Sequence, residues 1–275
     1  MSHATINGAR LWYEVSGAGE PLLLHHGYTA ARANWAPVAE RLHDKYQVIM
    51  MEGRGTGDSE HSAAGYTLEQ YTADVIGMLD HLGLDKVNFA GHSMGGGIGY
   101  LLALEHGERL EKLILMAPIP AQGIGEVTPE LRAERMAERQ RGDREAILAR
   151  YRMMRFRADV ETEDWFNHRV EQILGVSDGH FVSSAEAMEA FNVEARLGEI
   201  NTPTLMIAGA VDGLLLPNLA DYMRLPNATL EVLSRAGHEI GVHEPERVAQ
   251  AIDQFLQHGV VTHATLMQRL VEQEG

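Results

Sequence analysis

A glycine-rich turn between a buried strand and a helix constrains this chain more than any other stretch. Residues 86–104 read as an apolar run, a tight turn and a second apolar run. A glycine inside a helix costs about 0.8–1 kcal/mol relative to alanine, so an ordinary helix would not begin with Gly95, Gly96 and Gly97. These glycines indicate close packing around the residue at the apex of the turn, Ser93.

The pentapeptide around Ser93 fits a known catalytic pattern. Gly91-His92-Ser93-Met94-Gly95 matches the nucleophile elbow, in which a sharp strand-to-helix turn exposes a serine hydroxyl above a sheet. The alternative is a glycine-rich connection with an incidental serine, because short motifs also arise by chance. The strand before the turn and the helix after it favour the elbow.

The chain alternates between buried apolar runs and helical patterns, which predicts a mostly parallel sheet flanked by helices. Besides the strand that leads into the elbow, strands are expected at 10–15, 21–25, 47–51, 113–117, 203–209 and 229–233. Helices are expected at 35–43, 67–82, after Ser93, at 217–225 and at 245–257. The fold class is therefore α/β.

Residues 121–200 interrupt this alternation. Strand-like runs vanish, and charge-rich helical patterns at 128–141 and 144–157 replace them. We expect a core formed by 1–120 and 201–275, with an inserted helical lid, or cap, at 121–200. Its apolar residues either line a pocket above the sheet or pack the lid onto the core: Tyr151, Met153, Met154, Phe156, Trp165, Phe166, Ile173 and Phe191. A further helix is expected over 263–275, packed on the core or on another subunit.

Composition narrows the function classes. The chain has 275 residues, no cysteine, and 23 Lys and Arg against 39 Asp and Glu, for a formal net charge of −16. Absent cysteine excludes disulfides and thiolate nucleophiles, and the negative charge argues against nucleic acid and anionic membranes as partners. The first residues lack a signal-peptide pattern, and no apolar run approaches the ~20 residues of a membrane span. We expect a cytoplasmic protein, monomer or homodimer, that acts on a small molecule.

Two residues can complete the chemistry of Ser93. A serine hydroxyl needs a base to take its proton and a third group to orient that base. Asp212 follows one predicted strand and His238 follows the next. The carboxyl ends of parallel strands share one edge of the sheet, where ligands bind in open α/β sheets. The sequence predicts that Ser93, His238 and Asp212 meet there.

With these residues in place, the chain resembles the α/β-hydrolase-fold serine hydrolases over nearly its whole length. The resemblance rests on His26-Gly27, on residues 54–59 (Arg-Gly-Thr-Gly-Asp-Ser), on the elbow, on Asp212 and on Gly237-His238, in that order. One departure is Glu52, where the family usually has aspartate. No carboxylate lies at 117–120, the other place where the family puts its acid, which favours Asp212.

The resemblance implies a mechanism. Ser93 would attack an acyl carbonyl while His238 accepts its proton and Asp212 orients the imidazole. The backbone N–H groups of Tyr28 and Met94 would stabilise the oxyanion, with no metal or organic cofactor. We expect a hydrolase of carboxylic esters, lactones included, acting on a small to medium, largely apolar substrate. A carbon–carbon bond hydrolase using the same triad is the main alternative, and a non-catalytic ligand-binding protein is a third.

Overall fold

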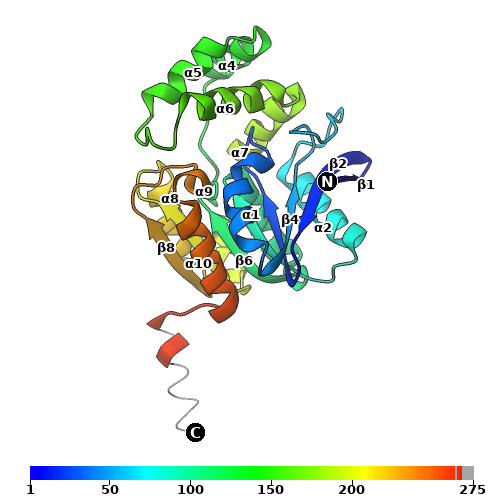
Figure 1. Ribbon diagram of the computed structural model, residues 1–275, viewed down its shortest axis with the longest axis vertical. Helices are drawn as coiled ribbons and strands as arrows, with labels where there is room; N and C mark the ends of the chain where they lie inside the picture. The colour runs from blue at the N-terminus through cyan, green and yellow to red at the C-terminus, as the bar shows by residue number, and fades with distance from the viewer. Residues whose placement is uncertain (264, 268–275) are drawn as a thin grey trace.

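The core of the protein is one eight-stranded sheet (Figure 1). The structure is a computed structural model that describes residues 1–263 and 265–267. The strands lie in the order β1-β2-β4-β3-β5-β6-β7-β8, and every neighbouring pair from β4 onward in that order is parallel. The strands are β1 (Ser2–Ile6), β2 (Ala9–Ser16), β3 (Glu20–His25), β4 (Tyr46–Met51), β5 (Val87–His92), β6 (Leu110–Met116), β7 (Thr204–Gly209) and β8 (Ala228–Leu233).

Helices cover both faces of the sheet. The α-helices of the described residues are α1 (Ala36–Leu42), α2 (Leu68–Leu82), α3 (Met94–Glu105), α4 (Pro129–Gln140), α5 (Arg144–Met153), α6 (Glu163–Gly175), α7 (Ala185–Ala190), α8 (Leu215–Tyr222), α9 (Ile240–His243) and α10 (Pro245–His258). Helices α1, α9 and α10 share one hydrophobic core, and α2 and α3 belong to the core on the opposite face. The result is a three-layer α/β sandwich.

Side chains of the central strands alternate between these two cores. Leu22 and Leu24 of β3 pack with α1 and α10, and Leu23 between them packs with α2 and α3. All three are at most 1% exposed. A parallel strand covered on both faces reads as a continuous apolar run, which is why these strands could be located in the sequence.

Helix α2 begins and ends at the residues that the sequence predicts. The Thr67 side chain accepts a hydrogen bond from the Gln70 N–H at the first turn, and Gly83 ends the helix with a φ of +67°. Both are ordinary capping arrangements, because a side-chain oxygen satisfies a free N–H and glycine adopts the left-handed conformation without strain.

The N-terminal edge of the sheet is its antiparallel part. Strand β1 pairs antiparallel with β2, and β2 pairs antiparallel with β4. The sequence analysis located β2 but not β1, whose side chains are half exposed and lack an apolar run. The sheet is therefore parallel except for this hairpin.

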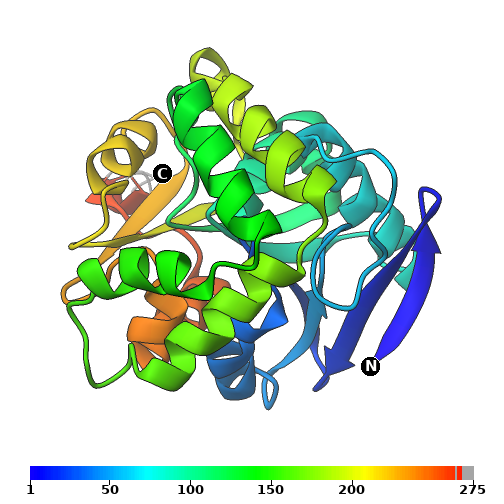
Figure 2. The same cartoon turned by 90° about the horizontal axis from the view of Figure 1, so that it is seen from above.

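Residues 121–200 form a helical segment above the carboxyl edge of the sheet (Figures 1 and 2). Helices α5 and α6 have a small hydrophobic core of their own, made by Ile147, Leu148, Phe166, Val170 and Ile173. The helix expected over 144–157 ends at Met153, because the chain turns and the Phe156 and Arg157 N–H groups donate to the Glu161 carboxylate. The boundaries expected for a separate lid remain a prediction.

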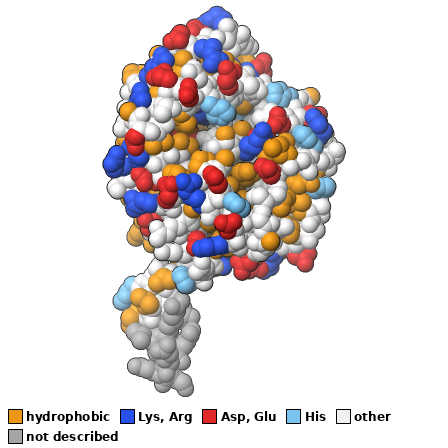
Figure 3. Space-filling view, in the orientation of Figure 1, with side chains coloured by type: hydrophobic (Ala, Val, Ile, Leu, Met, Phe, Trp, Pro, Cys, Tyr) orange, Lys and Arg blue, Asp and Glu red, His pale blue; other side chains and the backbone are white. Residues whose placement is uncertain are grey.

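The surface carries charges of both signs. On the face seen in Figure 3, basic and acidic side chains are interspersed rather than gathered in one patch. Among the described residues, none of the helices has the length and apolar character needed to cross a bilayer. The helix expected over 263–275 lies mostly outside the described residues.

Candidate active site

Ser93 occupies a strained turn that its surroundings hold in place. It follows β5 directly, with a φ of +55°. A non-glycine residue in such a conformation typically costs about 1–3 kcal/mol. The Ser93 N–H donates to the Met116 carbonyl at 3.0 Å, and its own carbonyl accepts from the N–H groups of Gly96 and Ile119 at 2.9 and 3.0 Å. The first turn of α3 and the strand beside β5 together fix this residue.

The glycines around Ser93 permit backbone segments to touch. A Cβ on Gly91 would lie 2.1 Å from the Gly95 carbonyl oxygen, and a Cβ on Gly95 would lie 2.5 Å from the His25 carbonyl oxygen. Real Cβ atoms do not approach backbone this closely. The glycines at the start of α3 thus allow the helix to begin against the ends of β3 and β5.

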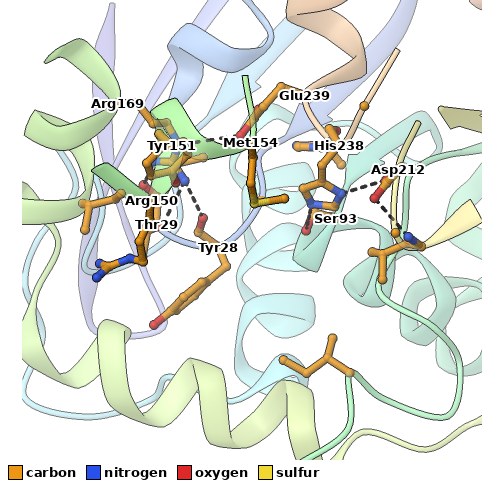
Figure 4. Close-up of a pocket in the computed structure, with 18 of the residues that line it drawn as sticks. Tyr28, Thr29, Ser93, Arg150, Tyr151, Met154, Arg169, Asp212, His238 and Glu239 are labelled. Carbon is orange, nitrogen blue, oxygen red and sulfur yellow. Dashed lines mark hydrogen bonds and ion pairs between the residues drawn. The ribbon is translucent and has the colours of Figure 1, made fainter. Parts of the chain in front are cut away.

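The three side chains expected to act together meet at the carboxyl edge of the sheet. His238 Nε2 lies 2.9 Å from Ser93 Oγ, and His238 Nδ1 lies 2.9 Å from Asp212 Oδ2 (Figure 4). Asp212 follows β7 and His238 follows β8, and the Asp212 Oδ1 atom accepts from the Leu214 N–H at 3.0 Å. An ionised carboxylate only accepts hydrogen bonds, so His238 Nδ1 carries the proton and donates it to Asp212. The Nε2 atom is then free to accept from the serine hydroxyl.

Electrostatics suit this arrangement to proton transfer. Burial disfavours the charged form of His238, but the hydrogen bond and the charge of Asp212 outweigh it and raise the pKa of His238. Burial alone would raise the pKa of the Asp212 carboxyl, but its hydrogen bond with His238 and the charge of His238 outweigh burial and lower that pKa. At neutral pH the pair can therefore hold a carboxylate beside an imidazole whose basicity it increases.

His92 holds the loop that carries the imidazole. Its Nε2 atom donates to the His238 carbonyl at 2.9 Å. Burial, with the nearby His238 as a second cause, lowers the pKa of His92 to about 4. His92 is therefore neutral at physiological pH and acts here as a hydrogen-bond donor to backbone.

The two backbone N–H groups expected to bind an oxyanion both lie beside Ser93. Met94 begins α3, and Gly27, which precedes Tyr28, is so close that an added Cβ would lie 2.9 Å from Ser93 Cβ. Within the described part of the chain, neither the Tyr28 nor the Met94 N–H donates to another protein group. Two free donors next to a candidate nucleophile are the arrangement that an oxyanion requires.

A cavity of about 600 Å³ opens over Ser93, between the sheet edge and the helical segment 121–200. Five of the apolar residues expected at a pocket line it: Tyr151, Met154, Phe156, Trp165 and Ile173. The other three do not. Met153 is 80% exposed, Phe166 is buried between α5 and α6, and Phe191 belongs to the main core.

The charged residues of this cavity were not predicted from the sequence. Five arginines line it, namely Arg132, Arg135, Arg139, Arg150 and Arg169. Most of them face carboxylates. Arg132 pairs with Glu186 and Glu189, Arg150 with Glu138, and Arg169 lies 3.6 Å from Glu239, the residue after His238. The cavity lining is mostly apolar, and these arginines give it a charged side formed by α4, α5 and α6.

Arg169 could have been noticed in the sequence. It lies on the buried stripe of α6 with Phe166, Val170 and Ile173. An arginine on an apolar helix face is rarely fully buried without polar partners, so its position signals a specific contact.

The family model of the α/β hydrolase fold matches residues 20–245. The chain belongs to the α/β-hydrolase family. It is a hydrolase with the family's mostly parallel sheet, and the resemblance drawn from its motifs is confirmed.

Relatives in this family are named for several different activities. The chain is 31% identical over 260 residues to "Putative carbamate hydrolase RutD" of Stutzerimonas stutzeri, covering 87% of this chain and 94% of that protein. It is 28% identical to a 2-hydroxy-6-oxononadienedioate/2-hydroxy-6-oxononatrienedioate hydrolase of Burkholderia vietnamiensis, covering 90% and 91% of the two chains. A solved enol-lactonase from Burkholderia xenovorans superimposes with a TM-score of 0.82 at 25% identity, covering 93% of this chain and all of that one.

Proposed function

We propose that this α/β hydrolase cleaves carboxylic esters, lactones included, through an acyl-enzyme on Ser93. The observation that carries the proposal is the continuous hydrogen-bonded chain from Ser93 through His238 to Asp212. In each half-reaction His238 first accepts a proton, from Ser93 or from water, and then donates it to the departing oxygen, while Asp212 keeps the imidazole in the required tautomer.

Oxyanion stabilisation supports the same reaction. As the acyl carbonyl becomes tetrahedral, its oxygen gains negative charge and needs donors that are already in position. The Tyr28 and Met94 N–H groups are the proposed donors, and the loss of one such donor typically costs about 2.7–4 kcal/mol in the transition state. The cavity of about 600 Å³ suits a substrate of small to medium size.

The names of two groups of relatives indicate other substrate classes. The RutD relatives are named for carbamates, and the Burkholderia vietnamiensis relative is named for an oxo-dienedioate. A carbon–carbon bond hydrolase would use the same three residues, so the triad does not distinguish it from an esterase. The enol-lactonase likeness favours the ester and lactone proposal.

A substrate panel tests the proposal. Purified enzyme is assayed with p-nitrophenyl esters of increasing acyl length, γ- and δ-lactones, aryl carbamates and a vinylogous 1,5-diketone, each beside Ser93→Ala. We expect the highest kcat/KM on an ester or lactone, and loss of that turnover in Ser93→Ala. Preference for the diketone or a carbamate by tenfold or more would replace the ester assignment. Equal turnover by Ser93→Ala would refute the proposed mechanism.

A further inference from the structure

Arg169 connects the helical segment 121–200 to the two loops that flank Ser93. It lies on α6 and is 5% exposed. Its Nη1 atom donates to the Thr29 carbonyl at 2.5 Å, and its Nη2 atom donates to Thr29 Oγ1 at 2.9 Å and to the Tyr28 carbonyl at 3.3 Å. Its Nε atom faces the Glu239 carboxylate at 3.6 Å. Figure 4 shows Glu239 between Arg169 and His238.

The loop that Arg169 contacts has a strained backbone. Residues 27–30 form a turn closed by a hydrogen bond from the Ala30 N–H to the Gly27 carbonyl at 3.2 Å. Thr29, the third residue of that turn, has a φ of +52°. Turns with a positive φ at this position normally place glycine or asparagine there, and a β-branched residue is strained. Such a conformation persists only when neighbouring groups hold it.

The groups that hold Thr29 come from the helical segment. Besides Arg169, His180 accepts the Thr29 N–H at its Nε2 atom at 3.2 Å. The other central residue of the turn is Tyr28, whose N–H is the proposed oxyanion donor. The contacts that hold this turn therefore come from residues more than a hundred positions away in the sequence.

The other end of the network reaches the loop of the general base. Glu239 Oε2 accepts from Asn34 Nδ2 at 2.6 Å, and Asn34 Oδ1 accepts from Gln172 Nε2 at 3.2 Å. Gln172 lies one turn after Arg169 on α6 and accepts from it at 3.2 Å. A planar guanidinium with five donors can serve both loops at once, whereas a lysine ammonium cannot reproduce this fork.

We propose that Arg169 is a positioning residue. From helix α6 it binds the strained Thr29 backbone and the Tyr28 carbonyl, and thereby orients the Tyr28 N–H toward the reacting carbonyl. The proposal rests on the proposed function, because it assigns Arg169 a part in oxyanion stabilisation. Arg169 does not touch the reacting atoms, so it acts on the rate through the geometry of the turn. Catalysis at Ser93 thereby depends on the seating of the helical segment over the sheet edge.

Kinetics of Arg169→Met and Arg169→Lys test the proposal. The matched control is Arg144→Met, because Arg144 also ties α5 to α6, through Glu171, but lies outside the cavity. We expect Arg169→Met to lower kcat by about 10- to 100-fold with KM changed less than threefold, since a displacement of about 1 Å at a reacting group costs on the order of 100-fold. Arg169→Lys should fall between this variant and the wild type, and Arg144→Met should match the wild type.

Chemical rescue and the split between KM and kcat separate positioning from folding and from substrate binding. Added guanidinium chloride, well below denaturing concentrations, should raise the kcat of Arg169→Ala relative to equal sodium chloride, and should not raise that of the wild type. A higher KM with unchanged kcat in Arg169→Met would overturn the proposal in favour of direct substrate binding. If Arg169→Met does not fold, a wild-type kcat in Arg169→Lys together with no guanidinium rescue of Arg169→Ala would overturn it.

The failure of this inference is distinguishable from failure of the proposed function. Wild-type Ser93 that does not react with a fluorophosphonate would contradict the proposed function itself. Wild-type Ser93 that reacts, with Arg169→Met reacting at the same rate, would contradict only the role of Arg169.

Discussion

Substitution of Gly91 by alanine should damage both folding and catalysis. The added Cβ would lie 2.1 Å from the Gly95 carbonyl oxygen, 2.3 Å from the Gly95 carbonyl carbon and 2.7 Å from the Gly96 nitrogen. Ordinary contacts begin at 3.4 Å, so the first turn of α3 must retreat from β5 by roughly 1.3 Å. Backbone cannot rotate away as a flexible side chain can, so the displacement reaches Ser93 and the Met94 N–H.

Two magnitudes follow from this displacement. Forcing extra volume into a close-packed site costs about 1–3 kcal/mol of the free energy of unfolding. A shift of about 1 Å at a nucleophile and its oxyanion donor costs on the order of 100-fold in kcat. The free energy is measured by urea unfolding, and kcat with the best ester of the substrate panel.

A matched glycine provides the control. An added Cβ on Gly107 would meet nothing closer than Thr202 Oγ1 at 3.8 Å, and Gly107 does not have a positive φ. Gly107→Ala should therefore leave kcat unchanged and alter stability by no more than about 1 kcal/mol, in the stabilising direction. If Gly91→Ala behaved like Gly107→Ala, the close approach of α3 to β5 would be wrong as an explanation of these glycines.

The other predictions concern the base, its pH dependence and a buried ion pair. Asp212→Asn should lower kcat by about 10⁴-fold, and activity within tenfold of the wild type would indicate another acid. Because His238 must be neutral to accept a proton and its pKa is raised, kcat/KM of the wild type should fall as pH decreases through a pKa above the usual histidine value of about 6.5; a pH-independent kcat/KM down to pH 5 would contradict this assignment. Arg54→Met should lower the free energy of unfolding, measured in urea, by about 3–5 kcal/mol, because the buried Asp74 carboxylate loses its cationic partner. The exposed Arg247, paired with Glu231, should cost at most about 1 kcal/mol when changed to Met, and equal losses would contradict the burial argument.

The positions of Ser93, Asp212 and His238 could be predicted because each follows a short run rich in apolar residues. Strands β5 and β7 are fully buried, and β8 is partly buried. Each residue follows a different parallel strand, and parallel strands end at one edge, so order in the sequence fixed the place in space. Strand β1 offered no such signal, since it is an edge strand with a half-exposed pattern. It lies at the end of the sheet beside β2, and Ala4 and Ile6 are its buried residues.

The cavity could not be predicted in the same way. Arg132, Arg135 and Arg139 recur at helical spacing on α4, yet a charged stripe usually faces solvent. Only the placement of α4 over Ser93 turns this stripe toward the cavity. The contacts of Arg169 with Tyr28 and Thr29 join residues about 140 positions apart and have no local signature in the sequence.

The most direct test of the central claim is site mapping with a fluorophosphonate probe. The enzyme is treated with the probe, digested, and analysed by mass spectrometry for the modified residue. We predict a single modified peptide that carries the phosphonyl group on Ser93, no modification in Ser93→Ala, and a strongly reduced labelling rate in Asp212→Asn. Modification of another residue, or an unmodified Ser93 in folded enzyme that still turns over its substrate, would contradict the account.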